Sequence, residues 1–216
     1  MRTKMMNPVF DFINTLCNFT VLNLVFLITC LPVVTIGAAL SSLYYVTLRE
    51  ARGEYGYLVR TYLKEFKSNL KSGTGAFLLL FAVGAAILFG LSFWYFLGTT
   101  FSAVVLGLLF IGSLLWLFTF SYTFPLIGRF ENTVKQTLKN AFSIAICNMK
   151  STLLLLLTDA LFLFFCLYFA PMKLLMVLFG FAFLAYCQSF ILNKVFEPYE
   201  KEQLEDTNAE MIAEMR

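Results

Sequence analysis

Long stretches without any charged side chain dominate this sequence of 216 residues. Asp, Glu, Lys and Arg are missing from residues 12–48, 72–128 and 174–193, and Asp159 is the only one of them in residues 151–172. A lipid bilayer demands such stretches, because a charge is costly in its hydrocarbon interior, whereas a water-soluble fold does not need them. The sequence therefore predicts a chain that is embedded in a membrane.

The composition agrees with this prediction. Apolar residues make up 60% of the chain and charged residues 13%, against roughly 45–50% and 25% in soluble domains. We expect one all-α membrane domain that covers residues 1–216. The sequence has no His and no C-x-x-C pair among its five cysteines, which removes Ser-His and Cys-His catalysis and the commonest metal ligand. We therefore expect neither an enzyme nor a site for a metal or cofactor.

The basic residues predict the topology. All Lys and Arg except Lys173 fall in four blocks, at residues 1–4, 49–71, 129–150 and 194–216. Basic segments stay on the cytoplasmic side, so we expect six crossings of a plasma membrane with both termini in the cytoplasm. The expected spans are about 9–31, 33–48, 75–97, 102–124, 152–170 and 174–193. Residues 33–48 are short for a crossing, and the alternative is a re-entrant segment that leaves five crossings.

Proline and glycine mark the ends of several spans. Asn7-Pro8 is typical of a helix start, and Pro32 ends or kinks the first span. The uncharged Gly98-Thr99-Thr100 and the segment Ala170-Pro171-Met172 are expected to form turns on the outer side.

Two amphipathic segments, about 55–72 and 131–150, are predicted to lie flat at the membrane surface. In the first, apolar residues recur at steps of three and four, from Tyr55 to Leu70. A second face carries Arg60, Lys64, Lys67 and Lys71. We expect the aromatic side to enter lipid and the basic side to meet anionic headgroups, with no role in binding nucleic acid. The acidic tail, residues 197–216, is expected to be mobile or loosely helical.

Asp159 is the sharpest candidate for a functional residue. It lies near the middle of an apolar span, where a carboxylate costs about 2.5–3.5 kcal/mol, and such residues often serve an ion or substrate pathway. The alternative is a structural hydrogen bond between helices. Other polar side chains at membrane depth could complete one polar seam with it: Asn14, Asn18, Tyr44, Tyr45 and Gln188.

Small residues four positions apart allow membrane helices to approach closely. Three such pairs occur in the predicted spans: Gly37/Ser41, Ala86/Gly90 and Ala103/Gly107. Pairs of this kind also arise by chance in spans rich in Gly and Ala.

Two stretches resemble a known family. Residues 6–16 read MNPVFDFINTL, and residues 31–74 begin LPVVTIGAALSSLYYVTLREARGEYGY and continue to FKSNLKSGT. This pattern resembles the YesL family of bacterial membrane proteins, whose domain has no assigned function. The family is commonly encoded beside genes for oligosaccharide uptake, so the resemblance implies a role linked to sugar import in a bacterium. It supplies no ligand and no binding residue.

Two functions from different classes follow. The first is a non-enzymatic accessory component of an ABC-type oligosaccharide importer, in contact with its permease subunits. The alternative is an independent small transporter or channel in which Asp159 binds a proton or substrate. The first is favoured by the basic amphipathic segments without a ligand motif, and the second by the intramembrane carboxylate.

Overall fold

A computed structural model describes residues 8–214, with side chains described for 15–99 and 101–201. Within this part of the chain every regular element is helical, which confirms the all-α class. In chain order the elements are α1 (Pro8–Cys30), the 3₁₀-helix η1 (Val33–Thr35), α2 (Ile36–Ala51), α3 (Leu58–Leu97), α4 (Thr100–Arg129), α5 (Val134–Cys147), α6 (Met149–Tyr168), α7 (Ala170–Leu175), the π-helix η2 (Met176–Gly180) and α8 (Phe181–Glu214).

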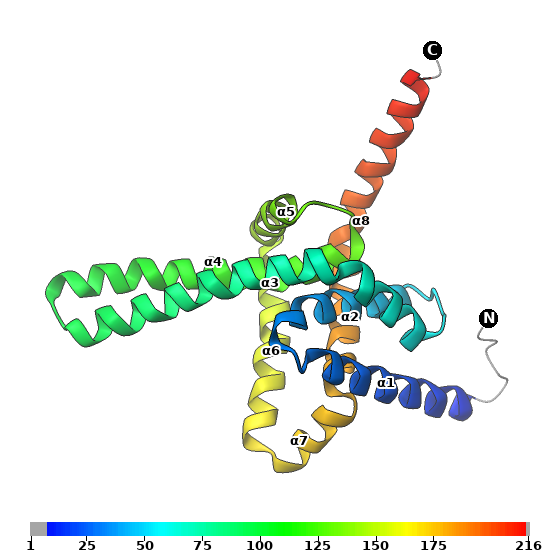
Figure 1. Cartoon of the computed structure of the whole chain (residues 1–216), viewed down its shortest axis with the longest axis horizontal. Helices are drawn as coiled ribbons and strands as arrows, with labels where there is room; N and C mark the ends of the chain where they lie inside the picture. The colour runs from blue at the N-terminus through cyan, green and yellow to red at the C-terminus, as the bar shows by residue number, and fades with distance from the viewer. Residues whose placement is uncertain (1–7, 215–216) are drawn as a thin grey trace.

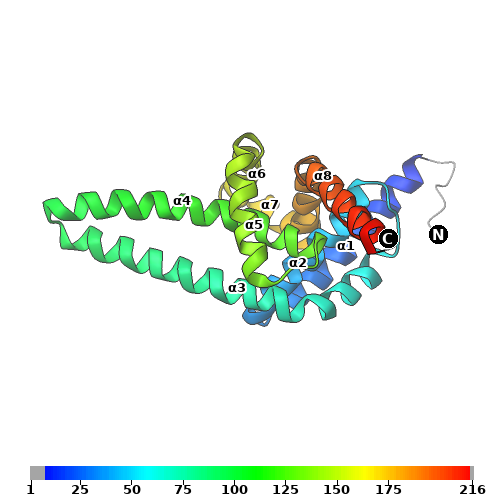
Figure 2. The same ribbon diagram turned by 90° about the horizontal axis from the view of Figure 1, so that it is seen from above.

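Two helical pairs extend from a common centre in different directions. The antiparallel pair α3 and α4 projects to one side, whereas α6 and the first part of α8 project to another and are joined through α7 (Figures 1 and 2). The rest of α8 continues past the centre in the opposite direction (Figure 1). The short helix α2 lies at the centre and contacts α1, α3, α4 and α8. Three clusters of buried side chains surround this centre, and two of them include residues of α2.

Four helical stretches of the described chain are long and apolar enough to cross a membrane: Leu58–Leu97, Phe101–Arg129, Met149–Tyr168 and Ala170–Lys201. Their apolar side chains remain largely uncovered by protein. Phe96, at the far end of the α3–α4 pair, is 85% exposed. Water does not tolerate surfaces of this size and composition, but lipid does, so the chain has the character of a membrane protein.

Local sequence signals explain the turns. Gly98 takes a left-handed conformation (φ 62°) that favours glycine, and it ends α3. The Thr99 and Ser102 side chains then form a reciprocal capping box that starts α4. After α1, Pro32 precedes η1, and Thr35 Oγ1 lies 2.7 Å from the carbonyl oxygens of both Thr29 and Pro32. The turn predicted at residues 98–100 is thus present, and α1 ends at the predicted place.

The first amphipathic segment differs from the expectation. It is not a separate surface helix but the first part of α3, which runs without interruption from Leu58 to Leu97. Leu58 and Tyr62 on its apolar side are buried against α1 and α2 instead of facing lipid, and the Tyr62 hydroxyl lies 2.5 Å from Thr29 Oγ1. The basic side chains Arg60, Lys64, Lys67 and Lys71 are exposed.

The structure also defines the ends of three further segments. Only Asn148 separates α5 from α6, so the second amphipathic segment leads directly into an apolar helix. The turn expected at residues 170–172 lies at Phe169, and Ala170 already begins α7. The acidic tail continues α8 as a helix to Glu214. The number of crossings and the side on which each end lies stay predictions.

Residues 33–48 form η1 and most of α2, and α2 itself has 16 residues. A helix of that length rises about 24 Å, less than the ~30 Å of a hydrocarbon core. Ten residues of α2 are buried within the protein. Because neighbouring helices rather than lipid enclose α2, its length need not match the bilayer.

Glycine allows the helices around α2 to approach this closely. A side chain on Gly37 of α2 would overlap with the carbonyl oxygen of Gly73 on α3, and one on Gly73 would place Cβ 2.7 Å from the Ala38 Cα. On another side of α2, a Cβ at Gly128 of α4 would lie 2.5 Å from the Ser41 carbonyl oxygen. Real Cβ atoms essentially never come so close to backbone, so any larger residue at these positions would force the helices apart.

We predict that Gly37→Ala and Gly73→Ala each lower the free energy of unfolding by about 1–3 kcal/mol, because the backbones of α2 and α3 must separate. The measurement is unfolding of the purified protein in mixed detergent micelles. Gly107→Ala is the matched control, since nothing lies within 4 Å of a Cβ at that helical position. Equal stability of the Gly37, Gly73 and Gly107 variants would show that the close crossing does not exist.

Candidate functional site

A seam of polar contacts joins α2 to α8 in the centre of the molecule. The contacts follow one another along both helices in the same chain direction, so α2 and α8 run parallel here. They are Tyr44 Oη donating to Gln188 Oε1 at 2.5 Å, Ser189 Oγ donating to Thr47 Oγ1 at 2.9 Å, and Asn193 Nδ2 donating to the Leu48 carbonyl oxygen at 3.1 Å.

Gln188 extends this seam to α6. Its Nε2 donates to Asp159 Oδ1 at 2.6 Å and lies 3.2 Å from Thr158 Oγ1, while its Oε1 accepts from Tyr44. Gln188 itself is buried. One amide group thus links three helices, which is how a buried polar side chain is satisfied in lipid. The structure therefore brings together Tyr44, Asp159 and Gln188, three of the residues proposed from the sequence.

The remaining residues of the proposed seam lie elsewhere or outside the description. Tyr45 points to another site, where its ring centroid lies 5.7 Å from the guanidinium carbon of Arg49. Asn18 is half-buried on α1 and takes no part in the contacts named above. The side chain of Asn14 falls outside the described residues.

A cavity of about 210 Å³ adjoins the seam. Most of its wall is aromatic or aliphatic, and its polar part comes from the seam and one serine. Its lining includes Phe26, Leu43, Phe124, Phe181, Ser121, Tyr44, Asp159 and Gln188. Asp159 lines this cavity and accepts a hydrogen bond from Gln188, yet neighbouring side chains leave it exposed.

The side chain of Asn23 on α1 has a structural role, because it bonds to backbone groups of η2 and α8. The side-chain Nδ2 donates to the carbonyl oxygens of Met176 (3.2 Å) and Val177 (2.7 Å), and its Oδ1 accepts from the Ala182 backbone N–H at 3.0 Å. These backbone groups belong to the π-helix η2 and the start of α8, where the normal helical pairing changes. Asn23 therefore holds the entry into α8 in place.

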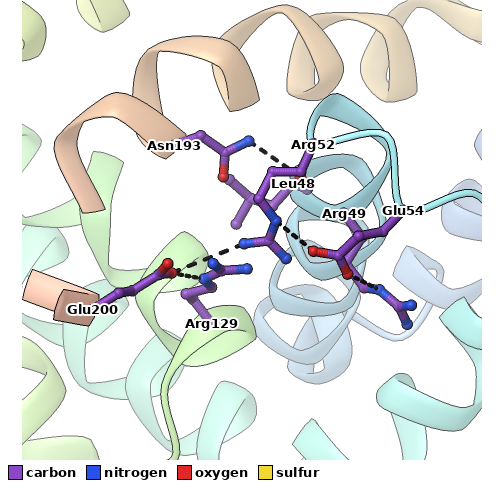
Figure 3. Close-up of polar contacts among 7 residues, drawn as sticks. All are labelled: Leu48, Arg49, Arg52, Glu54, Arg129, Asn193 and Glu200. Carbon is purple, nitrogen blue, oxygen red and sulfur yellow. Dashed lines mark hydrogen bonds and ion pairs between the residues drawn. The ribbon is translucent and has the colours of Figure 1, made fainter. Parts of the chain in front are cut away.

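A second polar cluster, missed by the sequence analysis, lies where the seam reaches the end of α2 (Figure 3). Glu54 receives one hydrogen bond from Arg49 Nε at 2.9 Å and one from Arg52 Nε at 2.7 Å. Glu200 of α8 accepts a hydrogen bond from Arg129 Nε and lies 3.9 Å from Arg52 Nη1. We call these five residues the arginine cluster.

Helix ends position the arginine cluster. Arg49 lies in the last turn of α2 and Arg52 caps that helix, while Arg129 lies in the last turn of α4. Cations are favoured there because the exposed carbonyl groups of a helix C-terminus carry partial negative charge. In the sequence, these arginines predict only which side of the membrane each loop occupies. Their positions at the ends of two predicted helices are the pattern that could have indicated the arginine cluster.

Among the residues that the structure describes, no three His, Cys, Asp or Glu side chains come close enough together to hold a metal ion.

Part of the chain matches a known family. Residues 19–91 match the family described as "Protein of unknown function, DUF624". This segment includes about half of α1, all of α2 and most of α3, and thus Tyr44, Arg49 and Arg52, but neither Asp159 nor Gln188. A search of curated proteins finds no match, and a search of solved structures finds none.

We predict that Tyr44 and Gln188 are energetically coupled. Tyr44→Phe and Gln188→Leu should each lower the free energy of unfolding, Tyr44→Phe by about 0.5–1.5 kcal/mol. The double variant should lose about 1 kcal/mol less than the two single effects together, because both substitutions remove one shared hydrogen bond. Tyr62→Phe, which removes the bond to Thr29, provides the control and should be additive with Gln188→Leu. Additivity in both pairs would contradict the seam.

Proposed function

We propose that this chain is a non-enzymatic component of a bacterial plasma membrane that assists an ABC-type oligosaccharide importer by binding its permease subunits. Both termini would lie in the cytoplasm, and the exposed basic face of α3 would meet anionic headgroups. The sugar context comes from the resemblance to the YesL family, and the DUF624 match is compatible with it. We infer the mode of action, which is contact with a partner helix inside the membrane, from the exposure of Asp159.

The exposure of Asp159 is the observation that carries this proposal. Its carboxylate lies in the middle of α6, among side chains such as Leu157, Leu161 and Leu163 that are about half exposed. A carboxylate that faces hydrocarbon is unfavourable by about 2.5–3.5 kcal/mol. A partner helix that offers a polar or basic side chain at this depth would remove much of that penalty. A second copy of this chain offers no Lys or Arg within its long uncharged stretches, so a different protein fits better.

The size of the cavity beside the seam favours an assisting role over direct sugar transport. Its volume of about 210 Å³ is below the ~300–1,000 Å³ of typical small-molecule sites. An oligosaccharide also needs many hydrogen-bonding groups, whereas this wall is mostly apolar. Recognition of the sugar is therefore assigned to the partner.

One observation favours the alternative of an independent small transporter. The cavity has room for several water molecules, each of which needs about 30 Å³, and it is lined by Asp159 and Gln188. A proton or a small ion could bind there. In that role Asp159 would change its protonation state during transport.

We predict that Asp159→Asn keeps the fold but reduces co-purification of importer permease subunits by tenfold or more, in order of magnitude. Asn still offers an oxygen to Gln188 Nε2, so the internal hydrogen bond is retained while the charge is lost. The tagged protein would be purified from its native host in mild detergent with the sugar present, and permease subunits would be quantified by mass spectrometry.

Leu157→Asn is the matched control, because it places the same amide on another exposed face of α6. It should leave co-purification unchanged. If wild-type protein brings down no permease subunit, the importer role is wrong. If Asp159→Asn recovers as much permease as wild type, Asp159 is only a structural link.

The transporter alternative makes a separate prediction. Wild-type protein reconstituted alone in liposomes would carry a proton current, measured with an internal pH dye, and Asp159→Asn would abolish it. Absence of any current from the wild-type protein would remove this alternative while leaving the importer role intact.

A further inference from the structure

The arginine cluster surrounds a hollow at the ends of α2 and α4 that the proposed function does not use. The hollow has a volume of about 390 Å³ and is lined by all three arginines together with Glu54, Tyr45 and Leu48. A neighbouring hollow of about 590 Å³ shares Tyr45, Gly128 and Arg129 in its lining. Volumes of this size lie within the ~300–1,000 Å³ range of ligand sites.

The charges around the hollow do not balance. Three guanidinium groups share two carboxylates, since Glu54 bonds to both Arg49 and Arg52, and Glu200 pairs with both Arg129 and Arg52. The cluster therefore carries an excess of one positive charge. Neither Glu50 nor Glu200 lines the hollow itself, and Glu200 is linked to it through its contacts with Arg52 and Arg129.

Arg52 also has unused hydrogen-bonding capacity. Its Nε donates to Glu54, but the buried Nη1 atom has no hydrogen-bond partner in the described part of the chain, and it lies 3.9 Å from Glu200 Oε1. A buried guanidinium nitrogen without an acceptor is unfavourable. An anionic oxygen in the hollow would satisfy it once the guanidinium group turns toward the hollow.

Phosphate is the anion that this geometry suits. Arginine presents planar, paired N–H groups that match the oxygens of phosphate, and several arginines together stabilise its charge. Glu200 already shows the required chemistry, because its carboxylate occupies a position between Arg52 and Arg129 (Figure 3). The basic blocks predict that this end of α2 faces the cytoplasm, where anionic headgroups are abundant.

We propose that this hollow binds a phosphate group through Arg49, Arg52 and Arg129, with the carboxylate of Glu200 acting as an internal competitor. The phosphate can belong to an anionic lipid headgroup or to a soluble phosphate. This inference goes beyond the proposed function and does not depend on it.

The test is binding to the full chain, purified in a neutral detergent and stripped of lipid. The probes are short-chain phosphatidylglycerol, short-chain phosphatidylcholine and inorganic phosphate, measured by the shift in thermal unfolding and by native mass spectrometry. Phosphatidylglycerol binding without phosphate binding assigns the site to a lipid headgroup. Binding of inorganic phosphate as well assigns it to phosphate groups in general. If neither phosphatidylglycerol nor inorganic phosphate binds, the proposal is overturned.

Substitutions of Arg52 and Glu200 should change the affinity for the probe in opposite directions. Arg52→Lys keeps the charge but loses the paired donors, so affinity for the bound probe should fall about tenfold. Arg49→Lys provides a second test if Arg52→Lys does not fold. Glu200→Gln removes the competing charge, so affinity should rise about threefold or more. A purely structural ion-pair cluster would not give tighter binding after loss of Glu200.

Lys64→Gln is the matched control, because Lys64 is exposed on α3 and does not line the hollow. It should leave affinity unchanged. A loss of affinity in Lys64→Gln with none in Arg52→Lys would mean that general surface charge attracts the probe, and weaker binding in a folded Glu200→Gln would mean that Glu200 does not compete. Either result would contradict the proposed site.

Discussion

The close approach of α2 to α3 and α4 is the constraint on which the rest of the structure depends. Gly37 meets Gly73 on one side, and the Ser41 carbonyl meets Gly128 on another. At these two crossings the backbones are too close for lipid or water to lie between them. The helix α2 is shorter than the hydrocarbon core of a bilayer and rich in hydroxyl groups. It can lie at the centre because protein surrounds it.

The same enclosure gives the polar groups their partners. Tyr44, Thr47 and the Leu48 carbonyl on α2 all bond to α8, and Gln188 passes the connection on to Asp159 of α6. In lipid the specificity of helix pairing comes from such contacts and from close packing, because apolar burial alone does not distinguish one helix from another. At the end of α2 the seam gives way to the arginine cluster. The molecule thus has one polar site among its apolar helices and another at the ends of α2 and α4.

Several features could be predicted from the sequence because they depend on neighbouring residues or on composition. The apolar stretches predict membrane helices, Gly98 and Thr99 predict the turn between α3 and α4, and Pro32 predicts the end of α1. The proposal that Asp159, Tyr44 and Gln188 share a seam also agrees with their observed contacts. Few polar side chains lie at membrane depth, and each needs a partner, so few pairings are available.

Other features depend on contacts between distant segments, which a single sequence does not reveal. The pairs Gly37/Ser41 and Ala103/Gly107 have the same spacing of four residues. Gly37/Ser41 lies at the close helix crossing, whereas no atom lies within 4 Å of a Cβ at Gly107. The apolar side of residues 58–66 is typical of a surface helix, yet Leu58 and Tyr62 face protein. The pairing of Arg52 and Arg129 with Glu200 joins residues from three helices. Here tertiary packing decides which of several equally good local patterns is used.

The most direct test of this account measures what surrounds α2 in a membrane. Single cysteines would replace Ala38 and Leu43 of α2, both buried, in a chain whose five native cysteines are changed to Ser or Ala. Phe89 and Leu157, both more than half exposed, would be replaced in the same way. The account predicts that a membrane-soluble maleimide labels positions 89 and 157 while positions 38 and 43 resist both this reagent and a water-soluble one. Rapid labelling of positions 38 and 43 from lipid would contradict the enclosure of α2.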